Sequence, residues 1–177
     1  MAQFVAFAPG VEVNGTTVMS IIAGMGEVAS PILIAHGFDN VQRDAWYSQQ
    51  AWLDTFREIA RMATRSCDLV SIGMEIPRNA NFPPGIDSIE SALKSIDVAY
   101  HMNHRGGEIG HYAALVISDR QVDLVCQNPY PCEFDYGIIY GMAARFCPKG
   151  AHVQIRHDDD ALCRQKGAES CTYHVTW

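Results

Sequence analysis

The residues of this chain best suited to chemistry lie near its C-terminal end, where two cysteines flank a glycine turn. Cys163 and Cys171 are separated by seven residues, and Asp160 precedes Cys163 by three positions. Two thiolates and a carboxylate suit Zn²⁺, and a fourth ligand could come from Cys132 or Cys147. Cysteine is also among the most buried residue types without any metal, and no Cys-x-x-Cys pair is present. The spacing therefore leaves a zinc site and a set of buried free thiols open as alternatives.

Three histidines between residues 101 and 111 form a second group that could bind a metal. His101 and His104 have the i, i+3 spacing of one helix face, and His111 follows after a Gly-Gly pair. Basic side chains are also favoured at the C-terminal ends of helices, where they interact with the last carbonyl groups. We therefore interpret these histidines as solvated side chains at a helix end.

A thiol enzyme is the main catalytic alternative. Cys132 stands at the start of a predicted helix, where a thiolate is favoured. A nucleophilic cysteine needs a base, and His111 or His157 could serve. The neighbouring Glu133 and Asp135 oppose this role, because nearby carboxylates disfavour a thiolate. The sequence also lacks the GxSxG, P-loop, GxGxxG and HExxH motifs, so an enzyme remains a secondary hypothesis.

Aromatic side chains are spread over the predicted helices and their connections. Their first interpretation is core packing, but several together could also line a pocket for a planar or aliphatic ligand. The side chains expected at such a pocket are Trp52, Phe56, Phe82, Tyr100, Tyr112, Tyr136 and Tyr140. Arg145 could pair with an acidic group of the ligand.

The elements that must position these side chains are helices and antiparallel strands. Val11–Val13, the Asn14-Gly15 turn signal and Thr16–Met19 predict an N-terminal β-hairpin. An apolar stripe on residues 52–63 predicts one helix, and a capping box at Asp87-x-x-Glu90 predicts the start of another. The fold class is therefore α+β, with helices packed on a twisted antiparallel sheet.

The second half of the chain supplies the remaining elements. The predicted elements are a hairpin of residues 109–117 and 122–125, a helix over 134–146, and strands at 151–155 and 171–177. Residues 76–85, with three prolines, predict an irregular connection that could form a pocket rim.

Composition excludes several classes of protein. Apolar residues make up 48% of the 177, which is enough for a hydrophobic core. Thirteen Lys and Arg against 20 Asp and Glu give a net charge of −7, which argues against nucleic-acid binding. We see no apolar run of membrane-spanning length and no basic signal-peptide start. We expect one cytoplasmic ligand-binding domain over 1–177, with 1–43 as an N-terminal extension or hairpin and 44–177 as its core.

The C-terminal motifs resemble a known family. The order of Asp160, Cys163, a glycine turn, Cys171 and an alternating strand is similar to the end of a 4-vinyl-reductase-type domain. The helix over 133–146, with glycines four apart, is similar to the helix before this element in hydrocarbon-sensing domains. The superfamily also contains haem nitric-oxide-binding sensors and transport-complex subunits. The resemblance covers residues 87–177.

The resemblance implies a sensor that holds a small apolar ligand between helices and sheet. Three of the family's zinc ligands correspond to Asp160, Cys163 and Cys171, and the thiol nearest to the fourth is Cys132. A haem sensor of this superfamily carries a Tyr-x-Ser-x-Arg motif, which this sequence lacks, so the sequence argues against haem. Zinc is the expected cofactor.

The functional prediction is a sensor that acts through a partner chain or as a homodimer. A thiol- or metal-dependent enzyme and a structural adaptor without an exchangeable ligand are the alternatives. No DNA-binding or ATPase segment is present, so the signal would pass to another chain.

Overall fold

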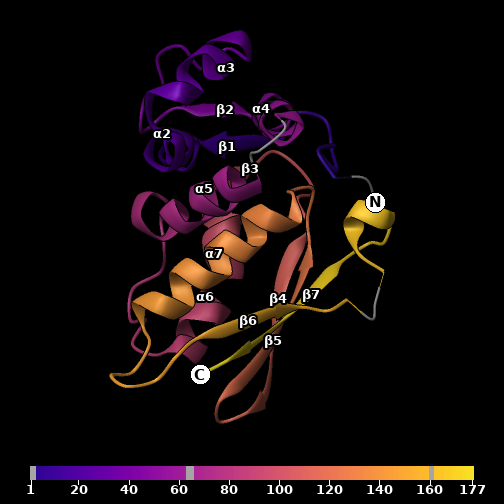
Figure 1. Cartoon of the computed structure of the whole chain (residues 1–177). Helices are drawn as coiled ribbons and strands as arrows, with labels where there is room; N and C mark the ends of the chain where they lie inside the picture. The colour runs from indigo at the N-terminus through magenta and orange to yellow at the C-terminus, as the bar shows by residue number, and fades with distance from the viewer. Residues whose placement is uncertain (1–2, 63–65, 160–161) are drawn as a thin grey trace.

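A four-stranded antiparallel sheet carries the C-terminal half of the molecule (Figure 1). The computed structural model describes residues 3–62, 66–159 and 162–177. The strands in spatial order are β4 (His111–Ser118), β5 (Gln121–Gln127), β7 (Cys171–Thr176) and β6 (Gln154–His157). Helices α6 (Ile89–Met102) and α7 (Cys132–Arg145) pack against this sheet, and α5 (Ser66–Asn79) packs against α7. The predicted α+β class is confirmed.

Period-two alternation explains why this sheet has one buried face. Along β7, Cys171, Tyr173 and Val175 are buried, and the residues between them are partly exposed. Residues of the same face in β5 include Leu124, which lies opposite Tyr173 in the antiparallel register. An alternating strand can bury one face only against another layer, and here that layer is the helices.

The N-terminal part of the chain forms a second layer of short elements. Its members are β1 (Glu12–Asn14), α1 (Gly15–Val18), α2 (Ser20–Met25), η1 (Gly26–Ala29), α3 (Ser30–Ala35), β2 (Trp46–Ser48) and α4 (Gln49–Arg61). Strand β1 pairs antiparallel with β2 and with β3 (His104–Arg105). An N-terminal strand pair is thus present, but its second strand is β2.

The predicted return strand Thr16–Met19 is helical instead. The side chain of Asn14 accepts a hydrogen bond from the backbone of Thr16 at 2.7 Å and so caps α1. Asparagine is favoured both in hairpin turns and at helix N-caps. Asn14 therefore begins a helix here and not the predicted hairpin turn.

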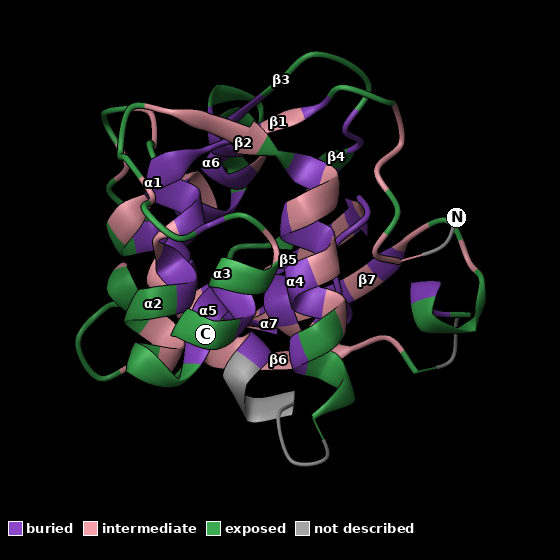
Figure 2. Ribbon diagram, turned by 90° about the horizontal axis from the view of Figure 1, so that it is seen from above, coloured by how far each residue is buried: buried purple, intermediate pink, exposed green. Residues whose placement is uncertain are grey.

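The helical run Gly15–Ala35 is long and apolar enough, by length and composition, to cross a membrane. The expectation that no such run exists was therefore wrong on these criteria. The run is broken into α1, α2, η1 and α3, and its residues Ile21 and Leu33 lie in the hydrophobic core. Figure 2 shows this mixture of buried and exposed residues along α2 and α3.

Helices α5 and α7 approach each other through glycine. A Cβ on Gly137 would lie 2.2 Å from the carbonyl oxygen of Val70 and 2.9 Å from the Cα of Gly73. The glycines predicted to allow close approach on this helix therefore do so at Gly137. The contact fixes α7, whose first residue is Cys132.

Candidate metal centre and ligand pocket

Three of the predicted metal-binding cysteines meet at one point. Cys132 begins α7, Cys163 precedes the short helix η2 (Arg164–Lys166), and Cys171 begins β7. Their sulfur atoms lie 3.2 Å (Cys132–Cys171), 3.3 Å (Cys132–Cys163) and 3.5 Å (Cys163–Cys171) apart. Sulfurs around a tetrahedral zinc, at about 2.3 Å from the metal, lie about 3.8 Å apart. The three thiols are therefore close to the spacing of a zinc site.

His157 provides a fourth donor that the sequence analysis did not place there. One ligand atom from each of Cys132, His157, Cys163 and Cys171 lies within 4.8 Å of the others. The Nε2 atom of His157 is buried and has no hydrogen-bond partner among the described residues. Its Nδ1 faces the carboxylate of Asp159 at 3.4 Å, the arrangement that orients a metal-binding histidine. An unpartnered buried nitrogen next to three sulfurs fits Zn²⁺.

The other two candidate ligands have different outcomes. Asp160 lies outside the described residues. The thiol of Cys147 lies at the end of α7 and donates to the carbonyl of Ala151 at 3.4 Å. His157 lies in β6 opposite Tyr173, two residues beyond Cys171, so the strand register and not a local sequence signal places it beside the thiols.

The charges around the cluster favour one thiolate. Hydrogen bonds from Cys132 and from Arg164 lower the pKa of Cys171, although burial opposes this shift. The hydrogen bond to Cys171, together with burial, raises the pKa of Cys132. Cys132 is also only 7% exposed, so it does not have the accessible, acidified thiol that a nucleophile requires.

A buried ion pair stands behind the cluster. Arg164 and Asp135 are 2% and 0% exposed, and the guanidinium Nη2 donates to the carboxylate. Asn128 donates to the same carboxylate at 3.3 Å, and Tyr112 donates to it at 2.7 Å. Burial raises the pKa of Asp135, while Arg164 and the Tyr112 hydrogen bond oppose that shift. The carboxylate thus has a full set of partners without water.

A second candidate site is an apolar cavity between α6, α7 and β4. Its volume is about 40 Å³, which is room for a few water molecules at most. The lining residues are Thr17, Ile76, Ala80, Phe82, Ile96, Ala99, Tyr100, Asn103, His104, Tyr112, Tyr130, Phe134 and Ile138. Aromatic rings therefore make up much of the wall of this cavity.

His104 is the chemically distinctive residue of this cavity. Its Nδ1 lies 2.8 Å from the backbone carbonyl of Tyr100, so Nδ1 carries the proton and Nε2 is the acceptor. The hydroxyl of Tyr130 donates to Nε2 at 2.6 Å. Burial lowers the pKa of His104 to about 4, so the imidazole is neutral at physiological pH. A neutral imidazole with Nδ1 held by a carbonyl is arranged as a metal ligand is.

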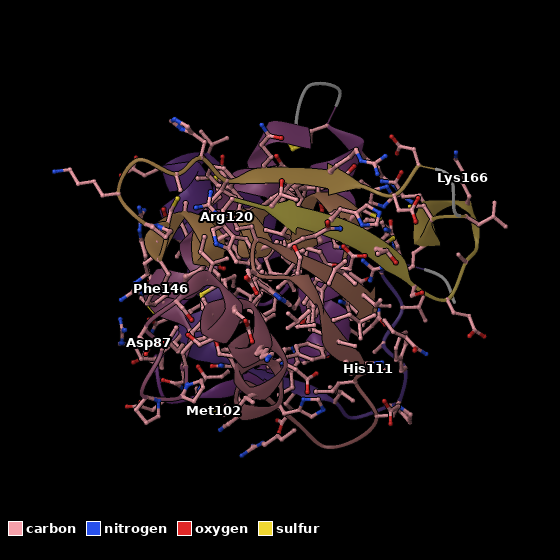
Figure 3. All side chains as sticks on the ribbon, turned by 90° about the horizontal axis from the view of Figure 1, so that it is seen from below. Asp87, Met102, His111, Arg120, Phe146 and Lys166 are labelled. Atoms are coloured by element: carbon pink, nitrogen blue, oxygen red, sulfur yellow. The ribbon has the colours of Figure 1, made fainter. Side chains whose placement is uncertain are left out.

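The predicted solvated histidines therefore divide into two groups. His104 is buried, and the prediction was wrong for it, because the chain turns into β3 immediately after α6 and carries the ring inward. His101 and His111 are exposed, as predicted. Figure 3 labels His111 together with Met102, the last residue of α6.

The structure separates the predicted ligand-binding residues into four places. Phe82, Tyr100 and Tyr112 line the cavity. Trp52 and Phe56 lie behind it, where Phe56 contacts Tyr130 and Phe134 edge-on or tilted. The remaining three lie elsewhere: Tyr136 near the cysteine cluster, and Tyr140 and Arg145 at a surface hollow beside Pro77.

Tyr130 and Thr17 are cavity residues that sequence reasoning missed. Tyr130 stands in a Pro-Tyr-Pro tract, which indicated only a turn before a helix. Thr17 was assigned to a strand, although it lies in α1. Both reach the cavity through long-range packing, which leaves no local signal in the sequence.

Comparison with solved structures identifies the fold. No family model and no curated protein matches the sequence. An H-NOX protein from S. oneidensis, solved in its Fe(II)NO state, aligns over 92% of this chain and 97% of its own, with 17% identity and a TM-score of 0.67. An H-NOX mutant from K. algicida aligns over 92% and 95%, with 10% identity and a TM-score of 0.63. The chain therefore has the H-NOX fold.

The likeness to these H-NOX structures extends over 92% of the chain and not only over 87–177. They do not show the 4-vinyl-reductase likeness. They also overturn the prediction against haem: the similar structures are iron-ligated domains, and one is described by its haem redox potential and porphyrin distortion. The missing Tyr-x-Ser-x-Arg motif was therefore too narrow a criterion for excluding haem.

The residues present meet only part of what haem requires. His104 offers a neutral imidazole nitrogen that could bind iron, and the cavity walls are apolar. Tyr130 covers that nitrogen, and about 40 Å³ cannot contain a porphyrin in this packing. Haem would therefore bind only in a more open arrangement of the same elements.

Proposed function

We propose that this chain is a ligand-binding sensor domain in which the His104 cavity receives the ligand and a zinc ion anchors the base of α7. The observation that carries the proposal is the buried, neutral imidazole of His104, whose Nε2 faces an apolar cavity. The H-NOX fold of the chain supports a sensor role, because its structural neighbours are characterised in different ligation states.

The ligand is proposed to be small or planar and largely apolar, with one atom able to bond to His104. Haem belongs to this class, and His104 would be its iron ligand. An apolar ligand with a hydrogen-bond donor would meet the same nitrogen. Either ligand must displace the Tyr130 hydroxyl, because that hydroxyl occupies Nε2 at 2.6 Å.

Displacement of Tyr130 provides a route to a signal. Tyr130 lies two residues before Cys132, the first residue of α7. A shift of this turn changes the packing of α7 on α5 and on the sheet, so the ligand selects between two packings. A zinc ion bound by Cys132, His157, Cys163 and Cys171 would hold the start of α7 to η2, β6 and β7. The first residue of α7 would then stay in place while the rest of the helix shifts.

Two measurements test the proposal. Metal analysis of the purified chain should give about one zinc per chain. Titration with haemin, followed by the Soret band and by shifts in melting temperature, should show binding that His104→Ala removes and His101→Ala retains. His101 is the matched control because it is an exposed histidine at the end of α6, three residues before His104.

The outcomes separate the hypotheses. If neither haemin nor a panel of aromatic and aliphatic compounds raises the melting temperature, the sensor proposal fails and the adaptor alternative replaces it. If zinc is well below one per chain, the anchor fails alone. The homodimer, the partner chain and the cytoplasmic location remain predictions.

A further inference from the structure

The described structure joins the two candidate sites through a continuous chain of buried polar contacts. Tyr112 lines the ligand cavity, and its hydroxyl donates to Asp135 at 2.7 Å. Asp135 in turn pairs with Arg164. The Nε and the backbone nitrogen of Arg164 each donate to the sulfur of Cys171 at 3.4 Å. Asp135 and Arg164 thus connect Tyr112, in the cavity wall, to Cys171, a candidate metal ligand.

The two central residues of this series of contacts, Asp135 and Arg164, each have several hydrogen-bond partners. The Nη1 of Arg164 donates to both the backbone and the side-chain oxygen of Asn128. Asn128 also donates to Asp135, which closes a ring of three residues. A guanidinium is planar and rigid, so its contacts with Asp135, Asn128 and Cys171 cannot change independently.

Burial makes these contacts expensive to lose. Tyr112 is 4% exposed, so a hydrogen bond broken here is not replaced by water. The ring of Tyr112 lies 5.2 Å from that of Tyr100, which in turn lies 4.4 Å from the ring of His104. A ligand that moves these rings must therefore also move the donor of the Asp135 hydrogen bond.

We propose that Arg164 is a positioning residue that couples metal binding at Cys171 to the ligand cavity through Asp135 and Tyr112. Arg164 orients the thiolate, and Tyr112 adjusts the orientation of Arg164. Coupling between two binding sites is reciprocal, so a ligand that displaces Tyr112 changes the metal affinity by the same factor as the metal changes the ligand affinity. The inference rests on the proposed metal centre and cavity.

Metal titration of the full chain tests this coupling. Zn²⁺ affinity is measured by competition with a chromogenic chelator, and Co²⁺ substitution gives the thiolate-to-metal charge-transfer band. Arg164→Lys should weaken metal binding about 10- to 100-fold, as outer partners of metal ligands do. Tyr112→Phe should weaken metal binding about 5- to 10-fold, at the lower end of the range of couplings between sites. Both should shift the Co²⁺ band.

Tyr100→Phe is the matched control. It removes a hydroxyl from the same cavity, but that hydroxyl donates to the carbonyl of Ile109 and lies outside the chain of contacts. Its metal affinity and Co²⁺ band should equal those of the wild type. Tyr112→Phe carries the test alone if Arg164→Lys does not fold.

Three results decide the matter. If Tyr112→Phe equals Tyr100→Phe in both affinity and spectrum, the coupling is overturned and the proposed sensor stands. If the wild type binds neither Co²⁺ nor Zn²⁺, the metal centre and the coupling fail together. A shifted band with weakened affinity in Tyr112→Phe supports the coupling, because a merely structural hydrogen bond would not change the metal's spectrum.

Discussion

Burial makes the charge of His104 a determinant of stability. Its pKa is about 4 in the folded chain, against about 6.5 for an exposed histidine, so the unfolded chain binds the proton more tightly. The contribution of this residue to the free energy of unfolding is therefore complete above pH 6.5 and is lost as the pH falls toward 4. The shift corresponds to about 3 kcal/mol.

The predicted pH dependence can be measured by urea unfolding at several pH values. We expect the wild type to lose stability between about pH 6.5 and pH 4. His104→Gln should show a smaller slope in this window, and His101→Gln, on the exposed side of α6, should retain the slope. Equal slopes in all three proteins would contradict the burial of a neutral imidazole.

Tyr130 should oppose ligand binding. Tyr130→Phe removes the hydroxyl that covers His104 and leaves a buried nitrogen unpaired, which should cost about 1–3 kcal/mol of stability. The same change should increase haemin affinity, because the ligand no longer competes with this hydrogen bond. Tyr140→Phe, at an exposed position of α7, is the control and should change neither the stability nor the haemin affinity. A lower haemin affinity in Tyr130→Phe would argue against displacement.

Residue types revealed only part of the two sites. Cys163 and Cys171 could be paired from sequence because a short glycine turn separates them. His157 and Cys132 join them through sheet register and helix placement, which depend on residues far away in the chain. His104 could not be recognised, because its burial depends on the packing of Tyr130 from another segment.

At the scale of elements, the contact between α5 and α7 is set by glycine. Gly137→Ala would place a Cβ 2.2 Å from the carbonyl oxygen of Val70, so one helix must shift. We expect a loss of about 1–3 kcal/mol or more, as for other overpacked cores. A Cβ on Gly141 would lie 3.1 Å from both the oxygen of Met74 and the Cγ of Pro77, a much smaller overlap, and Gly141→Ala gains helix propensity.

Thermal unfolding of the two glycine variants separates packing from propensity. Gly137→Ala should melt well below the wild type, whereas Gly141→Ala should remain near it. Similar melting temperatures for both variants would contradict the close approach at Gly137.

Periodicity predicted α4, α6, α7 and β7 well, but it failed at α1, where Asn14 caps a helix that the strand pattern did not anticipate.

At the scale of the whole molecule, the cysteine cluster ties together segments that are distant in sequence. A metal that binds only the folded state stabilises it by about 2.7 kcal/mol at a hundredfold excess over its Kd. We therefore expect the melting temperature to rise with free Zn²⁺ and to fall with a chelator. Cys163→Ser should remove this dependence, and Cys147→Ser, whose thiol lies away from the cluster, should preserve it.

The α+β class followed from local patterns, but the connection between layers did not. Strand β1 pairs with β2 and β3, so residues near positions 13, 47 and 104 meet in one sheet. No short-range signal encodes such pairing, because each strand has only two or three residues. The likeness to H-NOX structures across 92% of the chain became visible only in three dimensions.

The N-terminal segment contacts residues that the ribosome adds much later. The backbone nitrogen of Phe4 donates to the carbonyl of Pro129 at 2.7 Å, and Gln3 donates to the sulfur of Cys132. Since ribosomes add roughly 5–20 residues per second, Phe4 precedes its partner by roughly 6–25 s. Helices α2 and α3 wait for less time, because their packing partners α5 and α4 precede Pro129 in the chain. Chaperones that bind short apolar segments would therefore have their main opportunity on α2 and α3 before α5 has been synthesised.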